Sequence, residues 1–170
     1  AATYLGGPWF AGLVAIFAGL ATIEFYLLAR RLGASPSVHI GVALSVALAF
    51  AALFPGSGLG PALFILTLGA LLLERVFRQS YDRFLLDFGS TVAGSAYIGG
   101  MLSHAVLLRG LPLGLAWVAV TLVTTWISDS AAYFVGTAWG RRPFFPRVSP
   151  RKTLEGAIAG IAVGTAAGLA

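Results

Sequence analysis

The chain of 170 residues has no cysteine and few charged residues. The absence of cysteine excludes disulfides, thiolate metal sites and a cysteine nucleophile. Only 10% of the residues are charged, whereas an average soluble domain carries about 25%. Eleven basic and six acidic side chains cannot supply the polar surface of a water-soluble domain of this size. The composition therefore excludes a soluble globular domain.

The basic residues give no sign of nucleic-acid binding, although the net charge is +5. Such binding needs a clustered basic face on a soluble module, and none is visible. The two histidines, His39 and His104, are far apart in sequence and do not suggest a zinc site. Apolar residues make up 58% of the chain and the mean hydropathy is +0.90. This abundance excludes disorder and predicts an integral membrane protein.

Charge-free stretches mark the predicted membrane spans. A helix needs about 20 residues, with a range of roughly 17 to 25, to cross about 30 Å of hydrocarbon. We therefore expect an all-α fold, a polytopic transmembrane helix bundle of about five to six spans that forms a single domain over residues 1–170. The predicted spans are 8–28, 36–54, 56–73, 88–108, 111–135 and 150–170, with a loop over 137–149.

The basic residues predict the orientation of the spans. If the first span ends in the cytoplasm, ten of the eleven basic residues fall on the cytoplasmic side, in agreement with the positive-inside rule. Only Arg109 falls on the other side. The ten cytoplasmic residues are Arg30, Arg31, Arg75, Arg78, Arg83, Arg141, Arg142, Arg147, Arg151 and Lys152. The loop after the fifth span is therefore predicted to be cytoplasmic.

Glycine occurs 22 times and recurs every four residues in the last span. Small residues at this spacing let helix backbones approach closely in lipid. The glycines of this stripe are Gly156, Gly160, Gly164 and Gly168. We expect the stripe to pack helices together in a compact bundle. The same kind of contact would suit a homodimer.

Asp129 is a carboxylate deep in the fifth apolar segment. Burying such a group in a membrane costs about 2.5 to 3.5 kcal/mol, so it is a functional candidate by default. Helical spacing places Thr125, Asp129, Tyr133 and Gly136 on one face. Hard oxygen ligands suit Mg²⁺, which usually takes one or two carboxylates and completes its shell with substrate phosphates. The alternative is that Asp129 pairs with an arginine at the cytoplasmic interface.

Ser149 and Pro150 have the residue types of a helix N-cap and of a first helical position, and they predict a helix start there. Arg151 and Lys152 would then lie in the first turn, where cations oppose the helix dipole. A bound polyanion would reverse this effect, because free N–H groups and two cations would face it. The sequence thus suggests a phosphate site, and the alternative is an ordinary basic flank or a contact with anionic lipid.

Three more arginines, Arg141, Arg142 and Arg147, add charge to the same loop. Each of them is also explained by membrane topology alone. Glu155 follows the loop, and three roles are open for it. It can form an ion pair with Arg151, four residues before it on the same helix, or it can ligate a metal or hold Lys152.

Two blocks of sequence, taken together, resemble the CDP-diacylglycerol synthase (phosphatidate cytidylyltransferase) family. Residues 129–136 contain the pattern Asp-x-x-Ala-Tyr-x-x-Gly, and residues 149–156 read Ser-Pro-Arg-Lys-Thr-Leu-Glu-Gly. The order and spacing of the two blocks are specific when they occur together. Residues 116–164 resemble the family strongly, and residues 88–110 resemble it more loosely.

The resemblance implies an enzyme of the bacterial inner membrane that joins CTP to phosphatidate in the presence of Mg²⁺. Its products would be CDP-diacylglycerol and pyrophosphate. Asp129 would be the metal ligand or catalytic carboxylate, and Lys152 a catalytic cation. The predicted substrate-binding residues are Ser149, Arg151, Lys152, Thr153, Arg141, Arg142, Tyr133 and Glu155. Among these, Tyr133 and Glu155 match motif positions without a clear role.

The family also carries a C-terminal block with Asp, Lys, His-Gly-Gly and Asp-Arg elements, which holds acidic metal ligands. The chain ends before such a block, and it begins with Ala1 instead of methionine. We therefore expect a portion of a longer protein that does not catalyse turnover alone.

Two other functions remain open on the sequence. A CTP-dependent lipid-alcohol kinase would also need a cytoplasmic nucleotide site. A transporter or channel subunit would use Asp129 as an ion site, but it predicts polar residues on several spans. A purely structural subunit would leave Asp129 unexplained.

Overall fold

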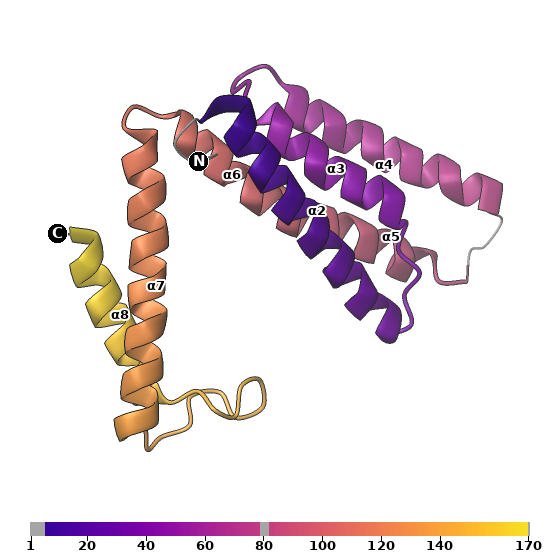
Figure 1. Cartoon of the computed structure of the whole chain (residues 1–170). Helices are drawn as coiled ribbons and strands as arrows, with labels where there is room; N and C mark the ends of the chain where they lie inside the picture. The colour runs from indigo at the N-terminus through magenta and orange to yellow at the C-terminus, as the bar shows by residue number, and fades with distance from the viewer. Residues whose placement is uncertain (1–5, 79–81, 170) are drawn as a thin grey trace. The chain divides into compact units, whose positions relative to one another are not determined.

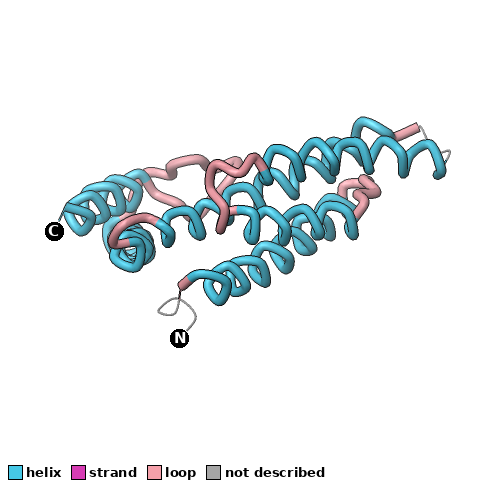
Figure 2. The backbone as a smooth tube through the Cα atoms, turned by 90° about the horizontal axis from the view of Figure 1, so that it is seen from above, coloured by secondary structure: helices cyan, strands magenta, loops and turns pink. Residues whose placement is uncertain are grey.

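The computed structural model describes residues 6–78 and 82–169, which form helices and connecting loops (Figures 1 and 2). The predicted all-α fold is confirmed. Residue contacts divide the chain into two compact units, Ala1–Leu115 and Ala116–Ala170. The single domain predicted over the whole chain stays a prediction. Ala170, the last residue of the sixth predicted span, lies outside the described part.

The first unit holds the helices that precede residue 111. In chain order these are α2 (Gly7–Arg31), α3 (Val38–Ala51), α4 (Leu59–Arg78), α5 (Phe84–Gly94), the π-helix η1 (Ser95–Gly100) and α6 (Met101–Gly110). The last three continue as one helix over Phe84–Gly110. The second unit consists of nearly all of α7 (Gly114–Trp139), a loop, and α8 (Leu154–Leu169).

Four helical segments of the described chain are long and apolar enough to cross a membrane. They are Gly7–Arg31, Leu59–Phe77, Phe84–Gly110 and Gly114–Trp139. Helices α3 and α8 are apolar but have only 14 and 16 residues. A 14-residue helix rises about 21 Å, which is less than the hydrocarbon thickness of about 30 Å. Each predicted span therefore matches a helical segment, but only four of the six have the length of a full crossing.

The third and fourth predicted spans have different limits in the structure. Helix α4 continues to Arg78, and α5 already begins at Phe84. The sequence placed Glu74 and Arg75 outside the span because charges usually end an apolar segment. In the structure Arg75 Nη2 lies 2.9 Å from Asp87 Oδ2, and both side chains are buried. This pairing lets the charged residues stay inside the helices.

Tyr26 of α2 is fully buried in the first unit. Its ring lies against Gly41 of α3 and Gly94 of α5, where an added methyl group would overlap ring atoms. Its hydroxyl donates a hydrogen bond to the carbonyl oxygen of Thr91 at 2.7 Å. Glycine at both positions is what lets three helices close around this side chain. The contact joins α2, α3 and α5 into one core.

Candidate functional site

The glycine stripe of α8 packs against small residues of α7 in the second unit. A Cβ added at Gly156 would lie 2.6 Å from the carbonyl oxygen of Ala132, and one at Gly164 would lie 2.9 Å from Cβ of Ser128. The Ser128 hydroxyl also donates to the carbonyl oxygen of Gly160 at 2.9 Å. The predicted packing role of the stripe is confirmed. Because α7 covers this stripe, it is not a free face for a homodimer.

Helix α8 begins at Leu154, so the predicted start at Ser149 and Pro150 is wrong. Thr153 is the residue that caps the helix: its Oγ1 accepts the amide of Gly156 at 3.2 Å, and its carbonyl oxygen accepts the amide of Ala157 at 3.0 Å. The segment that precedes it is a turn, in which the Lys152 amide donates to the Ser149 carbonyl oxygen at 3.1 Å. Threonine is also a common N-cap residue, and in the structure Thr153 caps α8 in place of Ser149.

The start of α8 at Leu154 also changes where the nearby cations lie relative to the helix. Arg151 and Lys152 precede α8 and do not lie in its first turn. The predicted conflict with the helix dipole therefore does not exist. Both side chains are exposed beside the start of the helix, where an anion would still meet positive charge.

A short antiparallel ladder fixes the backbone of the loop. The Phe144 amide donates to the Lys152 carbonyl oxygen at 2.8 Å, and the Leu154 amide donates to the Arg142 carbonyl oxygen at 2.8 Å. Between them, Pro143 and Thr153 pair across the ladder. The backbone of Lys152 is thus held in place while its side chain projects from the surface.

Glu155 joins the two ends of the same loop. Its Oε2 accepts the amides of Arg141 and Arg142 at 3.1 and 3.2 Å. Glu155 lies outside the four helices long enough to span a membrane. Its own amide, followed by those of Arg141 and Arg142, holds the pKa of the Glu155 carboxyl below its ordinary value. These contacts give Glu155 a role that the sequence did not predict, which is to hold the loop through two of its backbone amides.

The loop and its flanks carry five cations whose side chains are exposed. None of them forms an ion pair with a residue in the described part of the chain. The five are Arg141, Arg142, Arg147, Arg151 and Lys152. Such a group of exposed cations on a fixed backbone is suited to a ligand with several negative charges. We call it the cationic loop.

Asp129 lies in an open groove of about 480 Å³ between α7 and α8. Thr125 lines this groove beside it, and Thr165 lines it from α8. The side chain of Asp129 is exposed in the structure. We call this feature the Asp129 groove. It presents one carboxylate and several hydroxyl groups in an otherwise apolar helix pair.

The four residues that the sequence predicted on one face of α7 do not all lie together in the structure. Thr125 and Asp129 lie in the groove, but Gly136 packs near Thr153 and Gly156 of the α7–α8 contact. Tyr133 is exposed and makes an edge contact with the ring of Phe134, with 5.6 Å between ring centroids. It is not among the residues that line the groove.

Asp129 and the cationic loop are neighbours along α7 but are not in direct contact. Gly136 lies beside Thr153 at the end of the loop, since a Cβ on Gly136 would be 3.1 Å from Thr153 Oγ1. Asp129 precedes Gly136 by seven residues, which is about 10 Å of helix rise. A ligand that contacts both would have to extend along the helix pair.

The donor groups around Asp129 limit the kind of Mg²⁺ site that they can form. Over residues 6–78 and 82–169, no three His, Cys, Asp or Glu side chains lie together as a metal site. Asp129 therefore offers one carboxylate, with the Thr125 and Thr165 hydroxyls nearby in the groove. This set fits a Mg²⁺ ion that takes most of its ligands from substrate phosphates and water, as is usual for this ion.

Sequence reasoning missed two residues that shape the site, Ser128 and Thr165, and it gave a third, Thr153, the different role of a phosphate ligand. Thr165 lines the groove, Ser128 bonds across to α8, and Thr153 caps α8. The signal for Ser128 and Thr165 was their position next to Asp129 and Gly164. The signal for Thr153 was a second N-cap residue four positions after Ser149.

Comparisons with known proteins agree on one family. The family model described as "Cytidylyltransferase family" matches residues 1–170. A phosphatidate cytidylyltransferase of Bacillus subtilis is 36% identical over 78 residues, which are 45% of this chain and 29% of the relative. The enzyme of the same name from Brucella suis is 42% identical over 82 residues, or 48% of this chain and 30% of the relative.

A third relative, the phosphatidate cytidylyltransferase of Pseudomonas aeruginosa, is 44% identical over 57 residues. These are 34% of this chain and 21% of the relative. The chain thus matches less than a third of the length of these curated relatives. No solved structure matches the chain.

Proposed function

Because the chain belongs to the cytidylyltransferase family, we propose that the protein transfers CMP from CTP to phosphatidate and releases pyrophosphate. The names of three bacterial relatives support this reaction. The observation that carries the proposal is the combination, in one α7–α8 unit, of the Asp129 groove with the cationic loop. Both substrates are phosphate anions, and one of them is a lipid.

The cationic loop would bind the phosphates of CTP. Its backbone is fixed by the ladder and by Glu155, so the cations are held near each other before the nucleotide arrives. Arginine side chains such as Arg151 can donate two parallel hydrogen bonds to a phosphate, and Lys152 adds a compact charge. Preorganised cations of this kind stabilise the charge that develops on a transferring phosphoryl group.

In the proposed reaction a phosphate oxygen of phosphatidate forms a bond to the α-phosphorus of CTP. The bond from that phosphorus to the β-phosphate oxygen breaks, and pyrophosphate leaves with the electron pair. Mg²⁺, when bound, would neutralise the phosphate charges and favour departure of the pyrophosphate. Asp129 would hold the ion from the groove, and Lys152 would hold the phosphates from the loop. The enzyme thus acts by alignment and by charge, without a covalent group of its own.

The proposed site faces the cytoplasm at the bacterial inner membrane. Ten of the eleven basic residues lie on one predicted side, and CTP is a cytoplasmic substrate. Phosphatidate reaches the site from the membrane, in which α7 is long and apolar enough to lie. A homodimer remains a prediction.

The test uses the intact protein in detergent, with labelled CTP and dioleoyl phosphatidate. We expect formation of CDP-lipid and pyrophosphate, and a loss of about 100-fold or more in rate for Asp129→Asn and for Lys152→Ala. Glu24→Gln and Arg31→Ala are matched controls, because they remove exposed charges of α2 in the first unit. Wild-type rates in both site variants would refute the site. A phosphorylated lipid without CMP would show a kinase instead.

A further inference from the structure

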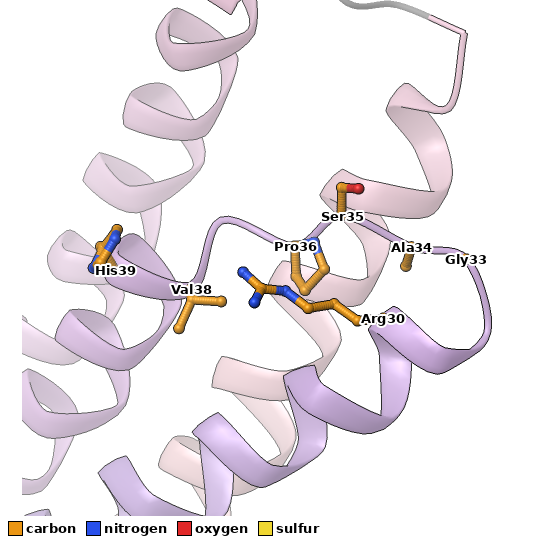
Figure 3. A pocket seen from close by; sticks show the side chains of 7 residues that line it. All are labelled: Arg30, Gly33, Ala34, Ser35, Pro36, Val38 and His39. Atoms are coloured by element: carbon orange, nitrogen blue, oxygen red, sulfur yellow. The ribbon is translucent and has the colours of Figure 1, made fainter.

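A second polar pocket lies in the first unit, at the turn between α2 and α3. Its volume is about 410 Å³, and Arg30, Gly33, Pro36 and His39 are among the residues that line it. Figure 3 shows the Arg30 side chain extending from the end of α2 past Pro36 toward Val38. We call this feature the Arg30 pocket. It is built from residues that the proposed transfer reaction does not use.

The Arg30 guanidinium has no ion-pair or hydrogen-bond partner among the described residues. The nearby acidic groups are engaged elsewhere. Asp87 pairs with Arg75 and accepts the Ser35 amide at 2.6 Å, and Glu74 accepts the hydroxyl of Ser37. The Arg30 side chain is exposed and lines a pocket that also contains His39, without a counterion from the described residues. An anion from outside the chain can therefore reach its guanidinium and accept hydrogen bonds from it.

The wall of the pocket is rigid. The Ser37 amide donates to Thr91 Oγ1 at 2.9 Å, and Arg83 Nη1 donates to the Gly33 carbonyl oxygen at 2.8 Å. Gly33 has φ +86°, a left-handed conformation that glycine adopts without strain. Together with the Ser35–Asp87 bond, these contacts hold the turn to α5 and its preceding residue. An anion would meet a site that does not have to be ordered first.

Ser37 adds a second feature to the pocket. It is the N-cap residue of α3, but its hydroxyl bonds to Glu74 and makes no capping bond. The first turn of α3 includes the lining residue His39. The amides of this turn that follow Val38 can therefore donate hydrogen bonds to a negative ligand. These donors supplement Arg30, whose unpaired charge lies in the same cavity.

The position of the pocket along α2 indicates the source of the anion. Helix α2 has 25 residues and rises about 37 Å, which exceeds the hydrocarbon thickness of about 30 Å. Arg30 lies in the last turn of this helix, so the pocket falls at the level of the lipid headgroups. Cations placed there attract anionic lipids of the cytoplasmic leaflet.

We propose that the Arg30 pocket binds the phosphate of an anionic phospholipid headgroup. The ligand class is a phosphodiester that carries a net negative charge and is anchored in the bilayer next to α2. The guanidinium of Arg30 would donate paired hydrogen bonds to the phosphate oxygens. The proposal uses none of the residues assigned to CMP transfer, so it stands or falls independently of the proposed activity.

The experiment measures the thermal unfolding midpoint of the intact protein in neutral detergent. Dioleoyl phosphatidylglycerol is added as the probe, with dioleoyl phosphatidylcholine and sodium phosphate in parallel arms. A ligand that binds only the folded state raises the midpoint. We expect phosphatidylglycerol to raise it in the wild-type protein and the other two additions to raise it much less. Arg30→Gln should lose more than half of the rise.

Arg31→Gln is the matched control, because Arg31 is the adjacent exposed cation and does not line the pocket. It should keep the rise. Since Arg30 has no described partner, Arg30→Gln should have the wild-type midpoint in the absence of lipid, which shows that the variant folds. A full rise in Arg30→Gln, or an equal loss in Arg31→Gln, would overturn the proposal. An equal rise with sodium phosphate would assign the pocket to a free anion, and an equal rise with phosphatidylcholine would remove the requirement for net charge; either result refutes the proposal.

Discussion

The effect on stability of an alanine substitution in the glycine stripe of α8 should depend on how close that glycine lies to α7. An added Cβ at Gly156 would lie 2.6 Å from a backbone oxygen of α7. At Gly164 it would lie 2.9 Å from the Ser128 side chain, and at Gly168 it would lie 3.7 Å from Thr124. Only the last distance is ordinary van der Waals contact. A backbone atom cannot rotate away, so Gly156→Ala must push the helices apart.

The magnitude follows from two opposing terms. Alanine is more favourable than glycine in a helix interior by about 1 kcal/mol, and this gain is smaller at Gly156 and Gly168, which lie near the two ends of α8. Overpacking a close contact costs about 1 to 3 kcal/mol. Gly168→Ala should therefore be neutral or stabilising by up to about 1 kcal/mol. Gly156→Ala should be less stable than Gly168→Ala by about 1 to 3 kcal/mol, with Gly164→Ala between them.

The assay is denaturant unfolding of the intact protein in detergent, followed by tryptophan fluorescence. Trp126 and Trp139 are exposed residues of α7 and report on this helix pair. Because Thr153 caps α8 next to Gly136, Gly156→Ala should also lower the CMP-transfer rate more than Gly168→Ala does. Equal unfolding free energies for the two variants would refute the packing of α8 on α7.

Three further predictions concern other contacts. Asp87→Asn or Arg75→Ala should each lower the unfolding free energy by about 3 to 5 kcal/mol, because one buried charge loses its partner; a double variant that is no more stable than the singles would contradict this. Gly41→Ala should destabilise the protein by about 1 to 3 kcal/mol, because the added methyl group would overlap the Tyr26 ring. Gly89→Ala, which has open space around it, should not destabilise the protein. Similar denaturation midpoints for the two variants would argue against the Tyr26 core. Glu155→Ala should speed tryptic cleavage at Arg147, while Glu155→Gln, which keeps an oxygen acceptor, should cleave near the wild-type rate; slow cleavage of both variants would show that Glu155 does not hold the loop.

The membrane helices could be predicted wherever charges lie outside them. The first span, predicted over 8–28, corresponds to α2 at Gly7–Arg31. The prediction was wrong at the junction of α4 and α5, where Arg75 and Asp87 neutralise each other. A sequence shows each charge but not its distant partner. A span predicted from its lack of charges is therefore too short when the helix carries one residue of a buried ion pair.

The candidate site could be predicted in its residue types but not in its arrangement. Helix α7 has small or polar residues on two adjacent faces, one with Ser128 and Ala132, the other with Thr125 and Asp129. Either face could have received the glycine stripe. Which face packs and which stays open depends on how closely the two helices approach each other, and residue spacing does not contain this information.

The start of α8 shows a similar limit. Ser149 and Thr153 are both suitable N-cap residues, and local preference alone favours the serine because Pro150 follows it. The choice is made by tertiary contacts. Gly136 and Gly140 leave room for Thr153, and the ladder with Arg142 holds the preceding turn away from the helix.

The Arg75–Asp87 pair also bears on how the chain enters a membrane. Either charge alone would oppose insertion of its helix, since an unpaired charged side chain within a membrane segment is costly. Paired at 2.9 Å, the two charges cancel only when both helices are present together. Helices α4 and α5 are thus expected to leave the insertion machinery as one hairpin. Insertion of α4 and α5 is then expected to depend on this ion pair as well as on the hydrophobicity of each helix.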